Sequence, residues 1–166
     1  MDLPRNDIPA PDRIAPRGAI RIVGLQAEAR ADDLSAIPPL WVDFNARAGE
    51  VNATPGTPAY GICMPADDDG AFRYIAGSEV AEMGTLPEGM VFALLAPQLY
   101  AVFTFDGPIW DLPVFVRSVW DTGLAAAGLT PARAPDFELY DERFDAQTGR
   151  GTVEIWIPLE PGDQAP

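Results

Sequence analysis

The sequence contains neither histidine nor lysine, and it has one cysteine. Without histidine, Ser-His-Asp and Cys-His catalysis and imidazole-based zinc sites are excluded. Cys63 alone supports neither a disulfide framework nor a thiolate metal cluster, and it fits a reducing compartment such as the cytoplasm. Any acid–base chemistry therefore falls to carboxylates or tyrosines, and the sequence predicts no cofactor.

Positive charge is also scarce, because 25 acidic residues face 11 basic ones and the net charge is -14. A surface that binds nucleic acid directly needs a basic patch, so this balance argues against one. No apolar run reaches membrane-spanning length without charge, and no signal peptide is expected. The acidity is compatible with a cationic ligand, although it is more often a solubility feature.

The 166 residues, of which 48% are hydrophobic, predict a single globular domain. Residues 1–18 carry four prolines among charged side chains and are expected to form a flexible N-terminal tail. The domain is expected over residues 19–160, in two units at about 19–82 and 90–160. Residues 161–166 are expected to form a C-terminal tail.

The first unit opens with an expected strand from Ile20 to Ala29. Ser35 is a plausible N-cap for the helix that follows, with two prolines in its first turn. The apolar residues of this helix recur at helical spacing: Ile37, Leu40, Trp41, Phe44 and Ala48. Two short strands, Tyr60 to Met64 and Phe72 to Val80, complete the unit.

The second unit repeats the order strand, helix, strand, strand. Its helix is expected to begin at Asp111 and to stop at Gly128, with one continuous apolar face that includes Trp120. Expected strands run over 90–96, 99–105, 137–140 and 152–157. The matching order suggests an internal duplication, and hence an α+β fold with both helices on one face of a mostly antiparallel sheet. A ligand groove is expected between the two units.

The last expected strand alternates cleanly between two kinds of side chain. Val153, Ile155 and Ile157 fall on one face, whereas Glu154 and Trp156 fall on the other. A carboxylate beside an indole is a plausible wall for a cationic or aromatic small molecule. The alternative is an outer sheet face, with Glu154 solvated and Trp156 packed under a loop.

The chain from about Ile20 to Leu159 resembles the GyrI-like small-molecule-binding domains, which are similar to the effector-binding domains of AraC-type and MerR-type bacterial transcription regulators. The residues that carry the resemblance are Ile37–Phe44, Tyr60–Ile62, Phe72–Val80, Leu99–Thr104, Asp136–Tyr140 and Val153–Pro158. The resemblance implies a tandem strand-helix-strand-strand fold with a groove between the units, and a role in binding drug-like or effector compounds.

The resemblance also implies a set of ligand-binding residues. An acidic residue on the last strand contacts cationic, lipophilic ligands in the family, and Glu154 occupies the matching place. Trp41, Tyr60 and Tyr74 match the aromatic positions, and Trp156 stands where the family often carries tyrosine. Each has an alternative: Trp41 as core, and the two tyrosines packed edge-on with their hydroxyl groups in water.

Three functions remain open on these residues. The first is a stand-alone module that binds a partly apolar, cationic or aromatic compound. The second is a hydrolase of strained cyclopropane-containing electrophiles, since some GyrI-like proteins resemble this chain and do so, with Glu154 as general base. The third is inhibition of DNA gyrase, the role of the family's namesake, which charge alone supports weakly. A small molecule is the expected partner, with no membrane; the sequence leaves the oligomeric state undetermined.

Overall fold

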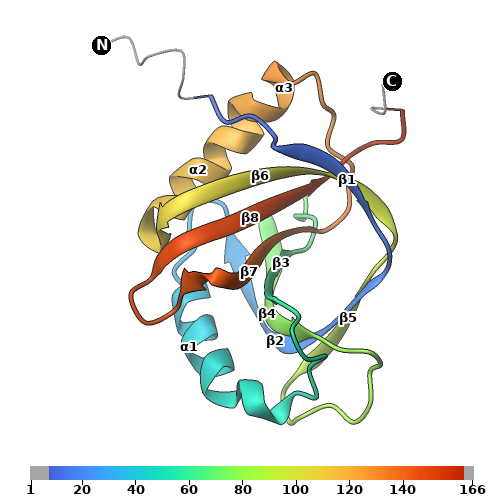
Figure 1. Cartoon of the computed structure of the whole chain (residues 1–166), viewed down its shortest axis with the longest axis vertical. Helices are drawn as coiled ribbons and strands as arrows, with labels where there is room; N and C mark the ends of the chain where they lie inside the picture. Colours follow the sequence, from blue (N-terminus) through green and yellow to red (C-terminus); the bar gives the residue numbers. More distant parts are fainter. Residues whose placement is uncertain (1–7, 163–166) are drawn as a thin grey trace.

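The computed structural model describes residues 8–162, which form a curled, eight-stranded antiparallel sheet with helices on one of its faces (Figure 1). The strand order is β1-β6-β8-β7-β3-β4-β2-β5. The strands are β1 (Arg13–Arg17), β2 (Ile20–Arg30), β3 (Ala59–Cys63), β4 (Ala71–Glu79), β5 (Val91–Leu95), β6 (Gln98–Pro108), β7 (Asp136–Asp145) and β8 (Arg150–Pro158). This confirms the predicted α+β class.

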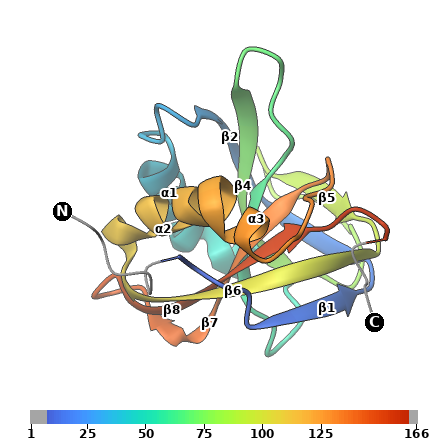
Figure 2. The same ribbon diagram turned by 90° about the horizontal axis from the view of Figure 1, so that it is seen from above.

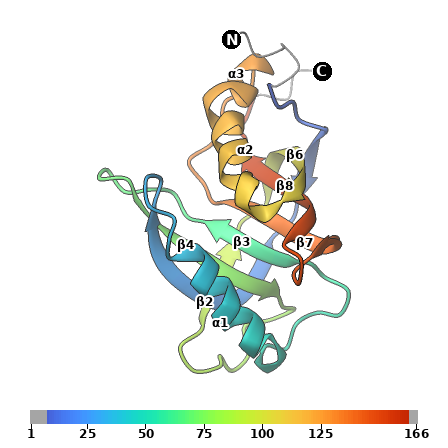
Figure 3. The same cartoon turned by 90° about the vertical axis from the view of Figure 1, so that its left-hand side faces the viewer.

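The two main helices pack on different halves of the sheet. Helix α1 (Ile37–Arg47) packs on β2 and β4, whereas α2 (Leu112–Ser118) packs on β6. Helix α2 continues through a π-helical segment (Val119–Gly123) into α3 (Leu124–Ala126). Figure 3 looks onto the helix-bearing side of the sheet and shows α2 above α1, over different strands. Within the described part of the chain, no helix is long and apolar enough to cross a membrane.

Three groups of buried side chains form the core, and the sheet separates one of them from the other two. The convex, helix-bearing face has a cluster under α1 that includes Val23 and Phe44, and another under α2 that includes Phe103 and Ile155. The concave face holds the third cluster. Its members are Ile20, Ile22, Tyr60, Ile62, Ile75, Ala93, Leu95, Tyr100, Val102, Phe137, Leu139 and Trp156.

The curl is closed by two bent ribbons. Strands β1 and β2 join at Gly18–Ala19, and β5 and β6 join at Ala96–Pro97, so that β1 pairs with β6 while β2 pairs with β5. The flexible tail expected over 1–18 is therefore wrong for residues 13–17, which run alongside β6 (Figure 2). Pairing with β6 supplies the hydrogen bonds that local sequence could not predict. Residues 1–7 and 163–166 lie outside the described residues.

The helix boundaries differ from the sequence prediction in two ways. Ser35 does not cap α1: the N-cap is Ala36, and the Ser35 hydroxyl donates instead to Asp33 Oδ1 at 2.6 Å. The apolar face expected along the second helix is also interrupted. Val119 is buried, whereas Trp120 is 39% exposed. Both lie in the π-helical segment, whose wider turn breaks the spacing that would place Trp120 between the helix and the sheet.

The alternation predicted for the last strand is confirmed. In β8, Val153, Ile155 and Ile157 pack in the cluster under α2, whereas Trp156 belongs to the concave cluster. Glu154 shares the concave side and is also buried. The alternative of an outer sheet face with a solvated Glu154 is thus wrong, because this face is an inner wall of the curled sheet.

Candidate functional site

A half-buried carboxylate, Glu138, lies on the helix-bearing face where the two central strands pair. It sits on β7 directly opposite Gly61 of β3. The hydroxyl groups of Tyr74 and Tyr140 both donate to Glu138 Oε1, at 2.7 Å and 2.9 Å. The indole N–H of Trp41 donates in turn to the Tyr74 hydroxyl at 2.8 Å. One carboxylate thus organises three aromatic side chains.

The second oxygen of this carboxylate is open. Among the described residues, Glu138 Oε2 accepts no hydrogen bond, and no buried side-chain oxygen or nitrogen there lacks a partner. Oε2 therefore meets solvent. A desolvated carboxylate with one occupied and one open oxygen is suited to a donor or cation that arrives from outside.

Gly61 makes the arrangement possible. Strand β3 lies between β4 and β7, so the hydrogen bond from Tyr74 to Glu138 must pass over it. A Cβ atom at position 61 would overlap the Tyr74 hydroxyl oxygen and lie 2.6 Å from Glu138 Oε1. Only a residue without a side chain leaves room for the bond.

The aromatic side chains come from both ends of the strand order. Tyr140 packs against the cluster under α2, and its ring meets the Trp41 ring of α1 edge-on at 5.1 Å. Trp41 also meets Phe44 at 6.1 Å, and it is only half-buried. Trp41 is therefore partly a core residue and partly exposed beside Glu138, and its role as a ligand contact stays a prediction.

The electrostatics of this face favour incoming positive charge. Asp136 lies two residues before Glu138 on the same side of β7. Burial raises the pKa of both carboxyl groups, and for Asp136, with the negative charge of Glu138 adding to burial, it reaches about 7. Within residues 8–162, no basic group lies within 4.0 Å of either carboxylate.

The single cysteine borders the same group of side chains. Cys63 is opposite Asp136 in the β3–β7 pairing and opposite Tyr74 in the β3–β4 pairing. Burial raises the pKa of its thiol well above the usual value, and the two nearby carboxylates add to the effect. The thiol is therefore protonated at neutral pH, and it lacks the thiolate character of an activated nucleophile.

Glu154 lies on the opposite, concave face and already has cationic partners. Arg13 contacts it at 3.2 Å and Arg143 at 3.0 Å, and the Trp156 indole N–H donates to it at 2.9 Å. Burial would raise the pKa of Glu154, but these hydrogen bonds outweigh it and lower the pKa. The direction is opposite to the one that a general base working near neutral pH needs.

Tyr60 and Trp156 also belong to the concave face. Their rings pack around Phe137, which stacks on Trp156 at 5.4 Å and meets Tyr60 edge-on at 5.4 Å. Both are almost fully buried. The five residues predicted as one ligand site are thus divided between two faces: Trp41 and Tyr74 lie beside Glu138, whereas Tyr60, Glu154 and Trp156 lie behind the sheet.

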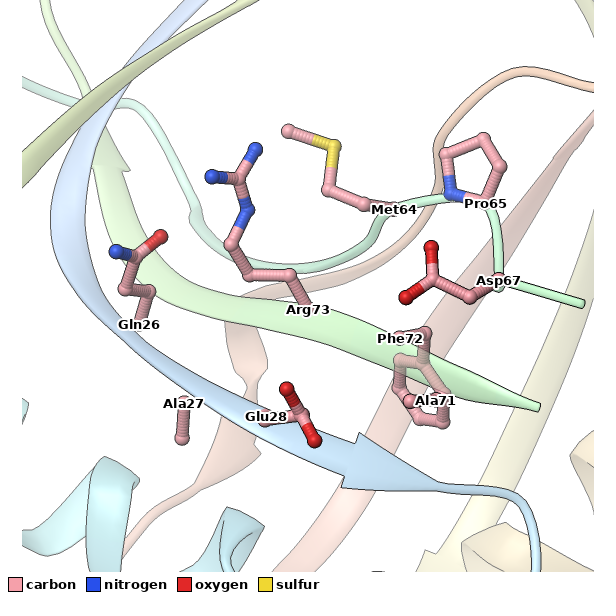
Figure 4. Close-up of a pocket in the computed structure, with 9 residues that line it drawn as sticks. All are labelled: Gln26, Ala27, Glu28, Met64, Pro65, Asp67, Ala71, Phe72 and Arg73. Carbon is pink, nitrogen blue, oxygen red and sulfur yellow. The ribbon is translucent and has the colours of Figure 1, made fainter. Parts of the chain in front are cut away.

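A separate open cavity of about 480 Å³ lies between the β3–β4 connection and the ends of β2 and β4 (Figure 4). Its lining includes the charged side chains of Glu28, Asp67 and Arg73 and the apolar side chain of Met64. None of the predicted site residues lines it. Its only aromatic lining residue is Phe72, so it offers little ring surface to a ligand.

Sequence reasoning did not select Glu138, Tyr140 or Gly61 for the site. The alternation Phe137-Glu138-Leu139-Tyr140 was visible as a signal, because it sets a carboxylate and a phenol on one face between two apolar residues. The local sequence does not show which face of β7 lies toward Tyr74. That depends on the pairing of β7 with β3, two strands far apart in sequence.

The sequence of this chain is similar to one described protein family and to one transcriptional regulator. The model of a family described as "Cass2: Integron-associated effector binding protein" matches residues 13–159. The transcriptional regulator BrlR of Pseudomonas aeruginosa is 35% identical over 149 residues, which are 89% of this chain and 54% of that protein. The chain thus spans about half the length of this curated relative.

Comparison with solved structures shows the same fold. The structure of SAV2435 bound to tetraphenylphosphonium has a TM-score of 0.73 at 19% identity, covering 90% of this chain and 93% of that one. An integron cassette protein of Vibrio cholerae has a TM-score of 0.68 at 25% identity, covering 89% and 95%. A putative transcription regulation protein of Staphylococcus aureus has 0.65 at 19% identity, covering 89% and 97%.

Proposed function

The chain belongs to the family of integron-associated effector-binding proteins, and we propose that it binds a small, partly apolar organic cation against Glu138. The family match and the fold agree with the GyrI-like resemblance seen in the sequence. In this proposal the open oxygen of Glu138 meets the positive charge. The rings of Trp41, Tyr74 and Tyr140 provide the apolar and cation–π contacts.

One observation carries the proposal. Glu138 is a half-buried carboxylate whose Oε1 is fixed by two tyrosine hydroxyl groups, whereas its Oε2 has no partner among residues 8–162. Its neighbour Asp136 likewise lacks an ion pair there. Desolvated acidic groups without a counter-charge are costly, and a bound cation would offset that cost.

The chemistry of one structural neighbour supports the ligand class. SAV2435 was solved with tetraphenylphosphonium, a lipophilic cation without hydrogen-bond donors. Such a ligand can be held only by ring contacts, apolar packing and unpaired negative charge. These are the features that surround Glu138, and they are largely absent from the cavity beside Arg73.

The position of the site supports a further part of the proposal, an internal duplication with the ligand between its two units. The chain order β2-α1-β3-β4 is repeated by β6-α2-β7-β8, and the strand order is symmetric about the β7–β3 pair. Glu138 lies at that pair, below aromatic residues from both units. Superposition of residues 20–79 on residues 98–158 tests the duplication, and unrelated backbones would contradict it.

Calorimetry with tetraphenylphosphonium and the neutral analogue triphenylphosphine oxide tests the binding proposal. Glu138→Gln keeps the shape of the side chain and removes its charge. We expect it to weaken binding of the cation roughly tenfold or more, because a charged contact in a desolvated site contributes about 1.5–3 kcal/mol. Binding of the neutral analogue should hardly change.

Glu154→Gln is the matched control, since it removes the other buried carboxylate that the sequence indicated. We expect both ligands to bind this variant nearly as they bind the wild type, provided that it melts cooperatively. If Glu154→Gln removes the preference for the cation and Glu138→Gln does not, the ligand binds on the concave face and the proposal is wrong.

A further inference from the structure

Strand β1 carries two arginines to the concave face. Arg13, Ala15 and Arg17 alternate onto one side of the strand, and Ala15 packs against the concave core. The Arg13 guanidinium pairs with Glu154 at 3.2 Å and lies 5.3 Å from the centre of the Trp156 ring. The carboxylate-and-indole wall read from the sequence thus does hold a cation, and the chain itself supplies it.

Arg17, four residues further along β1, makes an equivalent set of contacts. It donates to the Tyr60 hydroxyl at 2.9 Å and contacts Glu79 Oε2 at 3.5 Å. The Tyr60 hydroxyl donates to the same oxygen of Glu79 at 2.9 Å. The Arg17 guanidinium lies 5.7 Å from the Trp156 ring, so this ring is within 6 Å of both arginines, the range of cation–π attraction.

The charges of the wall match those of β1. Apart from β1, this part of the concave face holds three acidic side chains, Glu79, Asp141 and Glu154, and one basic side chain, Arg143. Arg143 is shared between Asp141 and Glu154. Two negative charges are left over, and the two arginines of β1 neutralise them.

Strand β1 is a short strand at one edge of the sheet. It has five residues, its one pairing partner among the described strands is β6, and Pro16 has no N–H group to donate. The Arg13 side chain is 46% exposed. Short edge segments of this kind open locally at low free energy.

We propose that the concave wall of Tyr60, Glu79, Glu154 and Trp156 is a recognition site for an extended segment with arginines four residues apart. In the single chain β1 fills this site, and in a pair of chains the β1 strand of a second copy fills it by strand exchange. The site is distinct from the Glu138 face, on the other side of the sheet. Strand exchange of this kind needs no new contact, because each β1 makes the same bonds in the partner.

A labelled peptide with the sequence of residues 8–18 tests the recognition site on the full chain. We expect it to bind the variant Arg13→Ala/Arg17→Ala at least tenfold more tightly than the wild type, whose own β1 competes at high effective concentration. The same peptide with citrulline in place of both arginines should bind at least tenfold more weakly, because citrulline keeps the shape and loses the charge.

Arg21→Ala is the matched control, since Arg21 is an exposed arginine of β2 outside the wall, and it should bind the peptide as the wild type does. Circular dichroism establishes that each variant is folded. The proposal would be overturned if the Arg13→Ala/Arg17→Ala chain is folded but does not bind the peptide. It would also be overturned if that chain binds the citrulline peptide as tightly as the arginine peptide.

The oligomeric state tests strand exchange without relying on that variant. Deleting Gly18 and Ala19 makes the link to β2 too short for β1 to reach its own wall. Light scattering should then give about twice the mass of one chain, which is 17.8 kDa before the deletion. Arg13→Ala/Arg17→Ala in the same deletion should weaken the dimer at least tenfold. A monomer, or a dimer that is indifferent to the two arginines, would contradict exchange.

Discussion

At the scale of single residues, Gly61 joins the fold to the candidate site. It is opposite both Ala76 of β4 and Glu138 of β7, and its missing side chain is the space through which Tyr74 reaches Glu138. The requirement is steric. It does not come from an unusual backbone conformation, because Gly61 has no positive φ.

Gly61→Ala should therefore lower the free energy of unfolding by about 1–3 kcal/mol, the usual cost of forcing a methyl group into a packed site. It should also weaken binding of tetraphenylphosphonium, since Tyr74 no longer orients Glu138. Urea denaturation and calorimetry measure the two effects. Gly49→Ala is the control, because nothing lies within 4 Å of a Cβ atom there; equal stability of the two variants would refute the steric account.

Asp136 predicts how stability depends on pH. Its pKa is raised from the ordinary 3.8 to about 7 by burial and by the charge of Glu138. Between these pH values the folded chain keeps a proton that the unfolded chain has lost, so the free energy of unfolding falls as the pH rises from about 4 to about 7. Asp136→Asn should remove this contribution.

Urea denaturation at pH 5 and pH 8 checks the prediction. The wild type should lose on the order of 1 kcal/mol more than Asp136→Asn between the two pH values. The exposed Asp121 is a suitable control position, and Asp121→Asn should leave the pH dependence unchanged. If Asp136→Asn behaves like that control, the Asp136 carboxyl is not desolvated.

The residue scale also shows where sequence reasoning reached its limit. Alternation alone placed Glu154 beside Trp156 on one face, and the structure agrees. It could not show that Arg13, 141 residues earlier in the chain, pairs with Glu154. For the same reason it did not select Glu138, whose partner Tyr74 is 64 residues away.

At the scale of elements, the second helix is anchored by its π-helical segment. Val119 is fully buried between the helix and the sheet, whereas Val114, five residues earlier, is 71% exposed. Val119→Ala should lower the free energy of unfolding by about 1.5–3 kcal/mol, through lost burial and the cavity left behind. Val114→Ala should change it by less than about 0.5 kcal/mol.

Thermal or urea denaturation separates the two variants. Similar losses for both would mean that α2 does not pack as described.

The order of the elements and most strand positions were predictable, because each strand and helix has its own periodic pattern. The exception was β1, since its residues Arg-Ile-Ala-Pro-Arg become a strand only through β6.

At the scale of the whole molecule, the net charge of -14 surrounds the Glu138 face with negative potential. Binding of tetraphenylphosphonium should therefore weaken several-fold between about 20 mM and 500 mM NaCl, as the screening length falls from roughly 20 Å to 4 Å. Triphenylphosphine oxide, which carries no net charge, should bind equally at both salt concentrations. Calorimetry at the two salt concentrations measures the difference, and a cation affinity that does not respond to salt would show that only short-range contacts act.

The hydrogen bond that crosses β3 at Gly61 has one more consequence. A one-residue slip of β3 would put Tyr60 or Ile62 in the place of Gly61, turn every side chain of the strand to the opposite face, and block the bond. Only the native register assembles Tyr74, Glu138 and Trp41 together. If the ligand binds against Glu138 as proposed, ligand affinity reports strand alignment: a chain with β3 in the wrong register could keep its secondary structure and compactness and still fail to bind the ligand.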